Sequence, residues 1–172
     1  RQQVIVDNRP GGNTVIGAEA LVRSTPDGYT LMTIAADHVI VANLVKTPFD
    51  AIRDFSPVAT LASSEYVLVV HPSVPAGNLK ELIALARARP GQLNYATSGN
   101  GTGVHMAAEL LKMLAGIDMQ QVSYKGSGPA LTDLMGGQVQ VMFSSPVNVI
   151  QHIRNNRLKA IAYAGDCLLY TS

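Results

Sequence analysis

The chain has 172 residues, a formal net charge of +1, 47% hydrophobic residues and one cysteine. This near-neutral charge argues against a nucleic-acid partner, and the single cysteine excludes an internal disulfide framework or a thiolate metal cluster. The apolar runs have the length of strands and fall well short of the ~20 residues that cross a bilayer. Composition therefore predicts a globular chain with a real core, in one domain or two small lobes.

The first third of the chain predicts short strands around two helices. The expected strands cover residues 4–6, 29–34 and 55–61, and the expected helices cover residues 14–24 and 39–45. Apolar, β-branched and aromatic residues fill the strands, and proline and glycine separate them. Asp37 and His38 follow the second expected strand, where they either line a cleft or begin a solvated helix.

From residue 66 onward the pattern becomes a regular alternation. The expected strands cover residues 66–70, 93–97, 121–124, 139–143 and 158–163, and the expected helices cover 78–89, 102–114, 129–135 and 146–155. Asn78 and Glu81 are spaced as a capping box at the start of the first of these helices. The alternation predicts an α/β fold with a parallel sheet and helices on both faces.

The helix expected at residues 102–114 should bury one stripe of apolar side chains against the sheet. Its inner face is expected to carry Val104, Ala107, Ala108, Leu111 and Leu114.

A glycine-rich turn joins the strand ending at Thr97 to this helix. The turn consists of Ser98, Gly99, Asn100, Gly101 and Thr102. Glycine lets the backbone approach a ligand closely, and the first amides of a helix lack intrahelical acceptors and lie at the positive end of its dipole. The turn therefore predicts a site for a carboxylate or phosphate, while the alternative is a well-capped turn that binds nothing.

Two more polar turns follow strands in the same way. They contain Tyr124, Lys125 and Gly126, and then Ser144 and Ser145. In open α/β sheets ligands bind outside the carboxyl ends of the strands, so we expect the three turns to line one site. Lys125 either holds an anion by its charge or is an exposed lysine in a loop.

Signatures of catalysis are weak. Ser98 lacks the flanking glycines of a nucleophile elbow, and the glycine turn matches neither the dinucleotide fingerprint nor the P-loop. His105 and Glu109 lie one helical turn apart and could share a metal or a proton, but a histidine in the first turn of a helix more often bonds nearby backbone or orients the loop. We therefore expect no enzyme, no metal and no cofactor. The catalytic alternative is a hydrolase with Ser98 as nucleophile and His105 as base.

Six short motifs occur in order along the chain. They are Asn8-Arg9-Pro10-Gly11, Pro26-Asp27-Gly28-Tyr29-Thr30-Leu31, Asp54-Phe55-Ser56-Pro57-Val58, Ser98-Gly99-Asn100-Gly101-Thr102, Tyr124-Lys125-Gly126 and Asp133-Leu134-Met135-Gly136-Gly137-Gln138-Val139. Together they resemble the Bug family, the extracytoplasmic solute receptors of tripartite tricarboxylate transporters, over residues 1 to about 164. The resemblance implies a two-lobed periplasmic-binding-protein type II architecture.

The resemblance also implies how the chain divides. Residues 1–70 would form part of lobe one, residues 71–162 lobe two, and residues 163–172 a return segment with an atypical tail that includes Cys167. Family members begin with a further strand and a Gly-Gly loop and continue beyond Gly165. We therefore expect a fragment in which lobe one is incomplete and from which a signal peptide is absent.

The function implied by the resemblance is capture of a small carboxylate in a cleft between the lobes. The implied partners are two integral-membrane transporter subunits, the implied location is the periplasm, and the protein is expected to be a monomer without nucleic acid. A small-molecule sensor module is the alternative. The expected ligand-binding residues are Ser98, Gly99, Asn100, Gly101, Thr102, His105, Tyr124, Lys125, Gly126, Ser144, Ser145 and Asp37.

Overall fold

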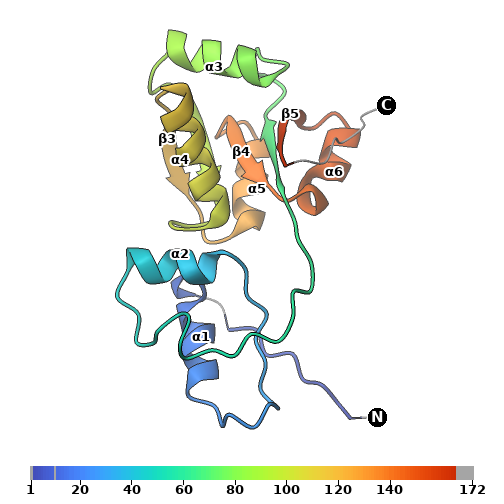
Figure 1. The fold of residues 1–172 in the computed structure, drawn as a ribbon. Coiled ribbons are helices and arrows are strands. Elements are labelled where there is room, and N and C mark those ends of the chain that lie inside the picture. The colour runs from blue at the N-terminus through green and yellow to red at the C-terminus, as the bar shows by residue number, and fades with distance from the viewer. Residues whose placement is uncertain (1, 10, 166–172) are drawn as a thin grey trace. The chain divides into compact units, whose positions relative to one another are not determined.

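The computed structural model describes residues 2–9 and 11–165, and these form two compact units (Figure 1). Unit 1 contains residues 1–59 together with 101–103, and unit 2 contains residues 60–100 and 104–172, each as far as it is described. Most of the predicted return segment, from residue 166 and including Cys167, lies outside the described residues.

Helices are the regular elements of unit 1. They are a short 3-10 helix at Gly12–Thr14, α1 at Val15–Val22 and α2 at Asp37–Leu44. The two α-helices confirm those predicted at residues 14–24 and 39–45. In the described part of this unit, no residue is in a strand.

The prediction of three strands before residue 62 was wrong. Residues 4–6, 29–34 and 55–61 pair with no strand among the described residues. Their apolar side chains lie open, as with Val4 at 86% exposure and Tyr29 at 83%. Strand formation requires a second strand to take up the backbone N–H and C=O groups, so β-branched composition alone does not produce one.

His38 lies in the core of unit 1, which corrects the expectation of a solvated helix start. Its side chain is 1% exposed. The imidazole stacks on Phe49 with ring centroids 5.8 Å apart and meets Phe55 edge-on at 4.5 Å. Its Nε2 lies 3.0 Å from the carbonyl oxygen of Ala51, so the ring has a polar partner as well as aromatic ones.

Unit 2 confirms the predicted alternation of strands and helices. Its elements are β1 (Tyr66–Val70), α3 (Leu79–Ala88), β2 (Asn94–Thr97), α4 (Gly103–Ala115), β3 (Gln120–Ser123), α5 (Ser127–Met135), β4 (Val141–Ser144), α6 (Pro146–Arg154) and β5 (Lys159–Ala164). The predicted capping box begins α3, because Asn78 Oδ1 accepts from the Glu81 amide at 3.0 Å and Asn78 Nδ2 donates to the Glu81 carboxylate at 2.7 Å.

The sheet is mixed, not wholly parallel as predicted. Its strand order is β3-β2-β4-β1-β5; β2 is parallel to β3 and β4, whereas β1 is antiparallel to β4 and β5. Val70, the last residue of β1, pairs with Val141, and Tyr95 near the start of β2 also pairs with Val141. Strand β2 therefore starts at the same end of the sheet at which β1 finishes, so β2 runs in the opposite direction to β1.

Helices cover both faces of the sheet, as predicted (Figure 1). Side chains of β1 alternate between two cores, with Leu68 and Val70 in one and Val67 and Val69 in the other. The first core also takes Leu82 from α3 and Ala108 from α4, and the second takes Leu134 from α5 and Val149 from α6. Burial on both faces explains the unbroken apolar run of β1.

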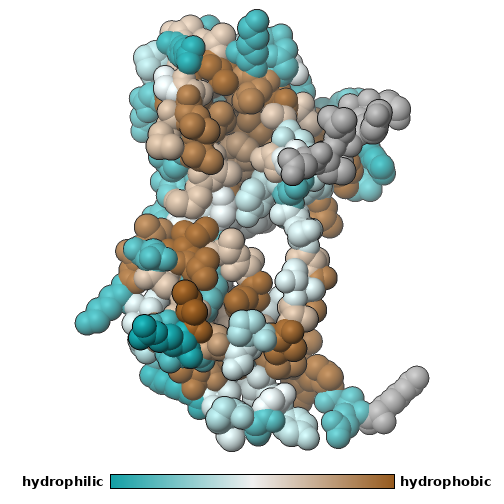
Figure 2. Space-filling model, in the orientation of Figure 1, coloured by the Kyte–Doolittle hydropathy of each residue, from teal (hydrophilic) through white to brown (hydrophobic). Residues whose placement is uncertain are grey.

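One predicted core residue of α4 faces solvent. Leu114 is 75% exposed, whereas Ala115 is 9% exposed and joins the first core. Spacings of four, three and four residues connect Val104, Ala108, Leu111 and Ala115 on the inner face, and Leu114 falls outside this stripe. Leu110 and Met113 are exposed beside it, and hydrophobic residues gather on this part of unit 2 in Figure 2.

Candidate functional site

The three polar turns follow adjacent parallel strands. Strand β2 lies between β3 and β4. The register pairs Thr97 with Ser123 and Ala96 with Met142, so Ser98 lies level with Tyr124 on one side and with Ser144 on the other. The turns therefore meet at one edge of the sheet of unit 2.

Hydrogen bonds join the first two turns to each other. The Tyr124 amide donates to the Thr97 carbonyl at 3.0 Å, and the Gly126 amide donates to the Ser98 carbonyl at 3.1 Å. Gln121 Nε2 also donates to Asn100 Oδ1 at 2.8 Å. The Gly126 amide is thus taken up by the main chain, and a ligand would meet this turn through other groups.

The Tyr124 hydroxyl points to the helix that follows it. It donates to Asp133 Oδ2 on α5 at 2.7 Å. Burial raises the pKa of Tyr124 to about 12, and the hydrogen bond to Asp133 and the charge of that carboxylate act in the same direction. At neutral pH the Tyr124 hydroxyl is therefore protonated and donates its proton in the hydrogen bond to Asp133.

Ionisation of Tyr124 is expected to destabilise the fold at high pH. The folded-state pKa of about 12 lies above the ordinary value of 10.0, so the unfolded chain releases the proton first as pH rises. The protonated Tyr124 hydroxyl therefore contributes its full stabilisation of the fold below pH 10, and this contribution is lost between pH 10 and 12. Urea unfolding at about pH 9 and about pH 11 gives the free energy of unfolding of the natural protein and of the Tyr124→Phe variant. The variant should lose more of this free energy at the lower pH. An equal loss at both pH values would contradict the linkage.

A second tyrosine makes the same kind of bond across the glycine-rich turn. Tyr95 on β2 is 1% exposed, and its hydroxyl donates to Glu109 on α4. Lys112 Nζ lies 2.9 Å from the same carboxylate and 5.3 Å from the centre of the Tyr95 ring. Burial raises the pKa of Tyr95, and the bond to Glu109 raises it further.

Glu109 stays ionised in this arrangement. Partial burial opposes its ionisation, but the hydrogen bonds from Tyr95 and Lys112 outweigh burial and lower the pKa of the carboxyl group. Sequence reasoning missed the pair because Tyr95 and Glu109 are 14 residues apart and no motif connects them. The sequence indicates this pair only in that a tyrosine precedes the turn and a glutamate follows it.

The third turn contacts the segment that enters the sheet. Ser144 is 2% exposed at the end of β4 and pairs with Val67. Ser145 is the N-cap residue of α6, and its Oγ lies 3.1 Å from Ser64 Oγ, just before β1. Of these two serines, Ser145 therefore lies closer to the surface.

A carboxylate occupies the first amide of α4. Residues 101–103 belong to unit 1, as does Asp37, and the Gly103 amide donates to Asp37 Oδ1 at 2.7 Å. Gly101 has a φ of +78°, a conformation that favours glycine. The amide at the start of this 13-residue helix thus donates to a carboxylate, the chemical group that the sequence predicted as its ligand.

The remaining predicted residues occupy different environments. Gly99 and Thr102 are buried, His105 is partly buried in the first turn of α4, and Lys125 is exposed after β3. Among residues 2–9 and 11–165, no group of three or more His, Cys, Asp or Glu side chains is placed to hold a metal ion.

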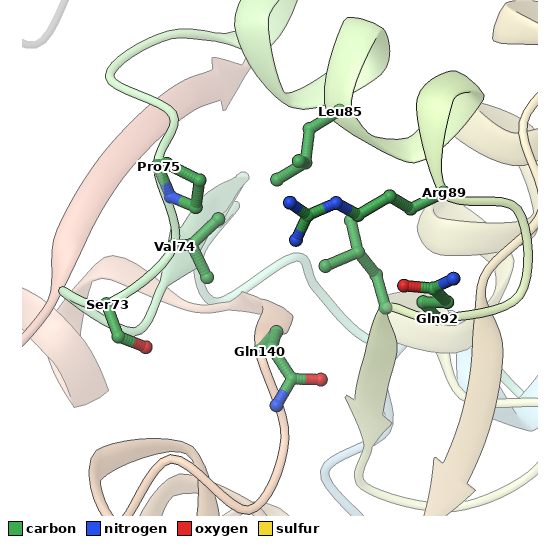
Figure 3. A pocket seen from close by; sticks show the side chains of 8 residues that line it. Ser73, Val74, Pro75, Leu85, Arg89, Gln92 and Gln140 are labelled. Carbon is green, nitrogen blue, oxygen red and sulfur yellow. The ribbon is translucent and has the colours of Figure 1, made fainter.

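A separate pocket of about 210 Å³ lies at the opposite edge of the sheet of unit 2 (Figure 3). Its wall includes Leu93 and Gln140, which directly precede β2 and β4, whereas the three turns follow those strands. Arg89 extends over the pocket toward Val74 and Leu85. None of the predicted ligand-binding residues lines it.

No described helix is both long enough and apolar enough to span a membrane.

Residues 1–167 match the family described as "Tripartite tricarboxylate transporter family receptor" (TctC). Protein BugT of Bordetella pertussis is 35% identical over 164 residues, which cover 94% of this chain and 50% of BugT. The chain therefore spans about half the length of this relative.

Two solved structures are similar in fold and were determined with carboxylates. An R. palustris protein with adipate has a TM-score of 0.85 and 30% identity, over 92% of this chain and 54% of that one. MatC from Rhodopseudomonas palustris, with bound malate, has a TM-score of 0.80 and 29% identity, over 91% of this chain and 54% of that one.

Proposed function

Because this chain belongs to the family of tripartite tricarboxylate transporter receptors, also represented by the Bug proteins, we propose that it captures a small carboxylate for transport. Members of the family are solute-binding receptors and not enzymes, which confirms that prediction and removes the hydrolase alternative. The fold is the α/β fold of periplasmic solute-binding proteins, here as a fragment.

The bond between the Gly103 amide and Asp37 is the observation that carries the proposal. It supports an anion-binding role because a carboxylate oxygen already lies at the positive end of α4 at 2.7 Å. An organic acid would be held there by Ser98, Gly99, Asn100, Gly101 and Thr102 in place of the Asp37 carboxylate, because two carboxylates at one amide would repel each other.

The other predicted residues would complete the site. His105 lies in the first turn of α4, Lys125 supplies a positive charge within the second turn, and Ser145 presents a hydroxyl at the third. Each neutral hydrogen bond contributes roughly 1 kcal/mol net. Micromolar affinity corresponds to about 8 kcal/mol, so several of these groups must act together.

The bound adipate and malate of the two similar proteins favour a dicarboxylate as the ligand. Delivery to two integral-membrane subunits and a periplasmic location are the parts of the proposal that rest on the family. The receptor would bind as a monomer, with residues 1–70 in one lobe and residues 71–162 in the other.

A thermal-shift panel of mono-, di- and tricarboxylates on the full-length natural protein tests the proposal. A ligand present at ~100 times its Kd should stabilise the fold by about 2.7 kcal/mol, which appears as a rise in Tm. Amides of the same carbon chains serve as controls because they keep the shape and lack the charge. Absence of any shift with millimolar acids, or equal shifts with the amides, would contradict the proposal.

A further inference from the structure

Two tyrosines connect the strands before the candidate turns to the helices after them. Tyr95 on β2 donates to Glu109 on α4, and Tyr124 directly after β3 donates to Asp133 on α5. The first pair encloses residues 98–102, and the second encloses residues 125–126. The same arrangement of tyrosine, turn and helical carboxylate therefore occurs on two neighbouring strands.

We propose that Glu109 and Asp133 are positioning residues of the candidate site. Each carboxylate fixes, through a tyrosine hydroxyl, the separation between the strand end and the helix that flank a ligand-binding turn. The inference rests on the proposed function. It also gives the Tyr124 hydroxyl a positioning role in place of direct contact with the ligand.

The pair around the glycine-rich turn has the properties that such a role requires. Tyr95 is 1% exposed, so its ring is held in the core, while the Glu109 side chain that accepts its hydroxyl is 42% exposed. The acceptor is an ionised carboxylate held on its other side by Lys112 at 2.9 Å. Hydrogen bonds to charged acceptors are stronger than neutral ones, and a tyrosine ring has only two side-chain torsions, so a fixed hydroxyl fixes the ring.

The turn is joined to its neighbours by hydrogen bonds such as that from Gln121 Nε2 to Asn100 Oδ1, and its glycines make its backbone conformation depend on contacts of this kind. Glycines at positions 99 and 101 have φ values of +144° and +78°, and glycine keeps the greatest conformational freedom in the absence of constraints. Apolar contacts such as those of Ala108 attach α4 to the sheet, and such contacts are non-directional. The bond from Tyr95 to Glu109, two turns into α4, adds a directional link between the strand and the helix.

Hydrogen exchange of the ligand-free, full-length natural protein tests the positioning role. In Tyr95→Phe and Glu109→Leu, the amides of residues 98–102 should exchange at least tenfold faster, while those of β1 and β4 stay protected. Glu109→Gln keeps an oxygen acceptor and should retain slow exchange. Tyr29→Phe is the matched control, since that tyrosine is 83% exposed.

Binding of adipate and malate by calorimetry gives the second readout. Affinity should fall about tenfold in Tyr95→Phe and in Asp133→Leu and should be largely restored in Asp133→Asn. Unchanged exchange at residues 98–102, or faster exchange with undiminished affinity, would overturn the inference. If exchange rises as expected but the wild-type protein binds no carboxylate, the pairs still position the turns and the proposed function fails instead.

Discussion

Replacement of Gly101 by alanine is expected to weaken carboxylate binding by about tenfold. Gly101 has a φ of +78°, and an alanine Cβ there would lie 2.7 Å from Leu44 Cδ1. Leu44 is 57% exposed, so its side chain can rotate away, but the strain of the left-handed conformation remains at about 1–2 kcal/mol. When the backbone relaxes to relieve this strain, the amides of the turn change direction. Ligand binding must then restore the strained conformation, so the binding free energy falls by about 1–2 kcal/mol.

Gly116→Ala is the matched control for this prediction. Gly116 follows α4 with a φ of +58°, and a Cβ there would meet no atom within 4 Å. Both variants should therefore lose similar stability, whereas only Gly101→Ala should lose affinity in calorimetry with the best acid of the panel. Equal affinity in the two variants would show that the turn at residues 98–102 does not hold the ligand.

The elements of unit 2 could be predicted because their signals are local. The capping box of Asn78 and Glu81 marks the start of α3, and Pro146 marks the start of α6. Each helix also carries an apolar stripe that contacts the sheet. The direction of β1 could not be predicted in this way, because it depends on which edge of the sheet the chain occupies when β2 begins.

Unit 1 was predicted less well because a strand-like composition forms a strand only where another strand pairs with it. Residues 29–34 have the composition of a strand, yet Leu31 is 72% exposed and pairs with no described strand. His38 shows the converse error, because its polarity suggested solvent while Phe49 and Phe55 enclose it. In both cases the outcome depends on whether other segments make contacts with the residue or segment, and composition does not record this.

The candidate site also combines features that could be predicted from local sequence with features that could not. Its three turns were identified from the order of strand, small polar residues and helix, and this order also places them at one sheet edge. The hydrogen bonds that occupy these groups were not foreseen. The acceptors of Tyr95 and Tyr124 lie 14 and 9 residues further along the chain, across a turn, at separations that only the folded strands and helices bring together.

Replacement of Leu134 by alanine is expected to lower the free energy of unfolding by about 2–5 kcal/mol, the usual range when a buried leucine is truncated. Leu134 on α5 is 0% exposed and packs in the second core against β1 and β4. Leu114→Ala on α4 makes the same change in a helix at a site that is 75% exposed, and should shift stability by about 0.5 kcal/mol or less.

Urea unfolding followed by circular dichroism distinguishes the two variants, and similar losses would mean that the second core contributes no more to stability than the surface of α4.

The Leu134→Ala substitution should also affect the candidate site. Asp133 directly precedes Leu134 and accepts the hydroxyl of Tyr124. A cavity at Leu134 should therefore loosen the second turn as well as the core, whereas Leu114→Ala should leave that turn unchanged, because Leu114 contributes its side chain to solvent and not to the packing of the sheet.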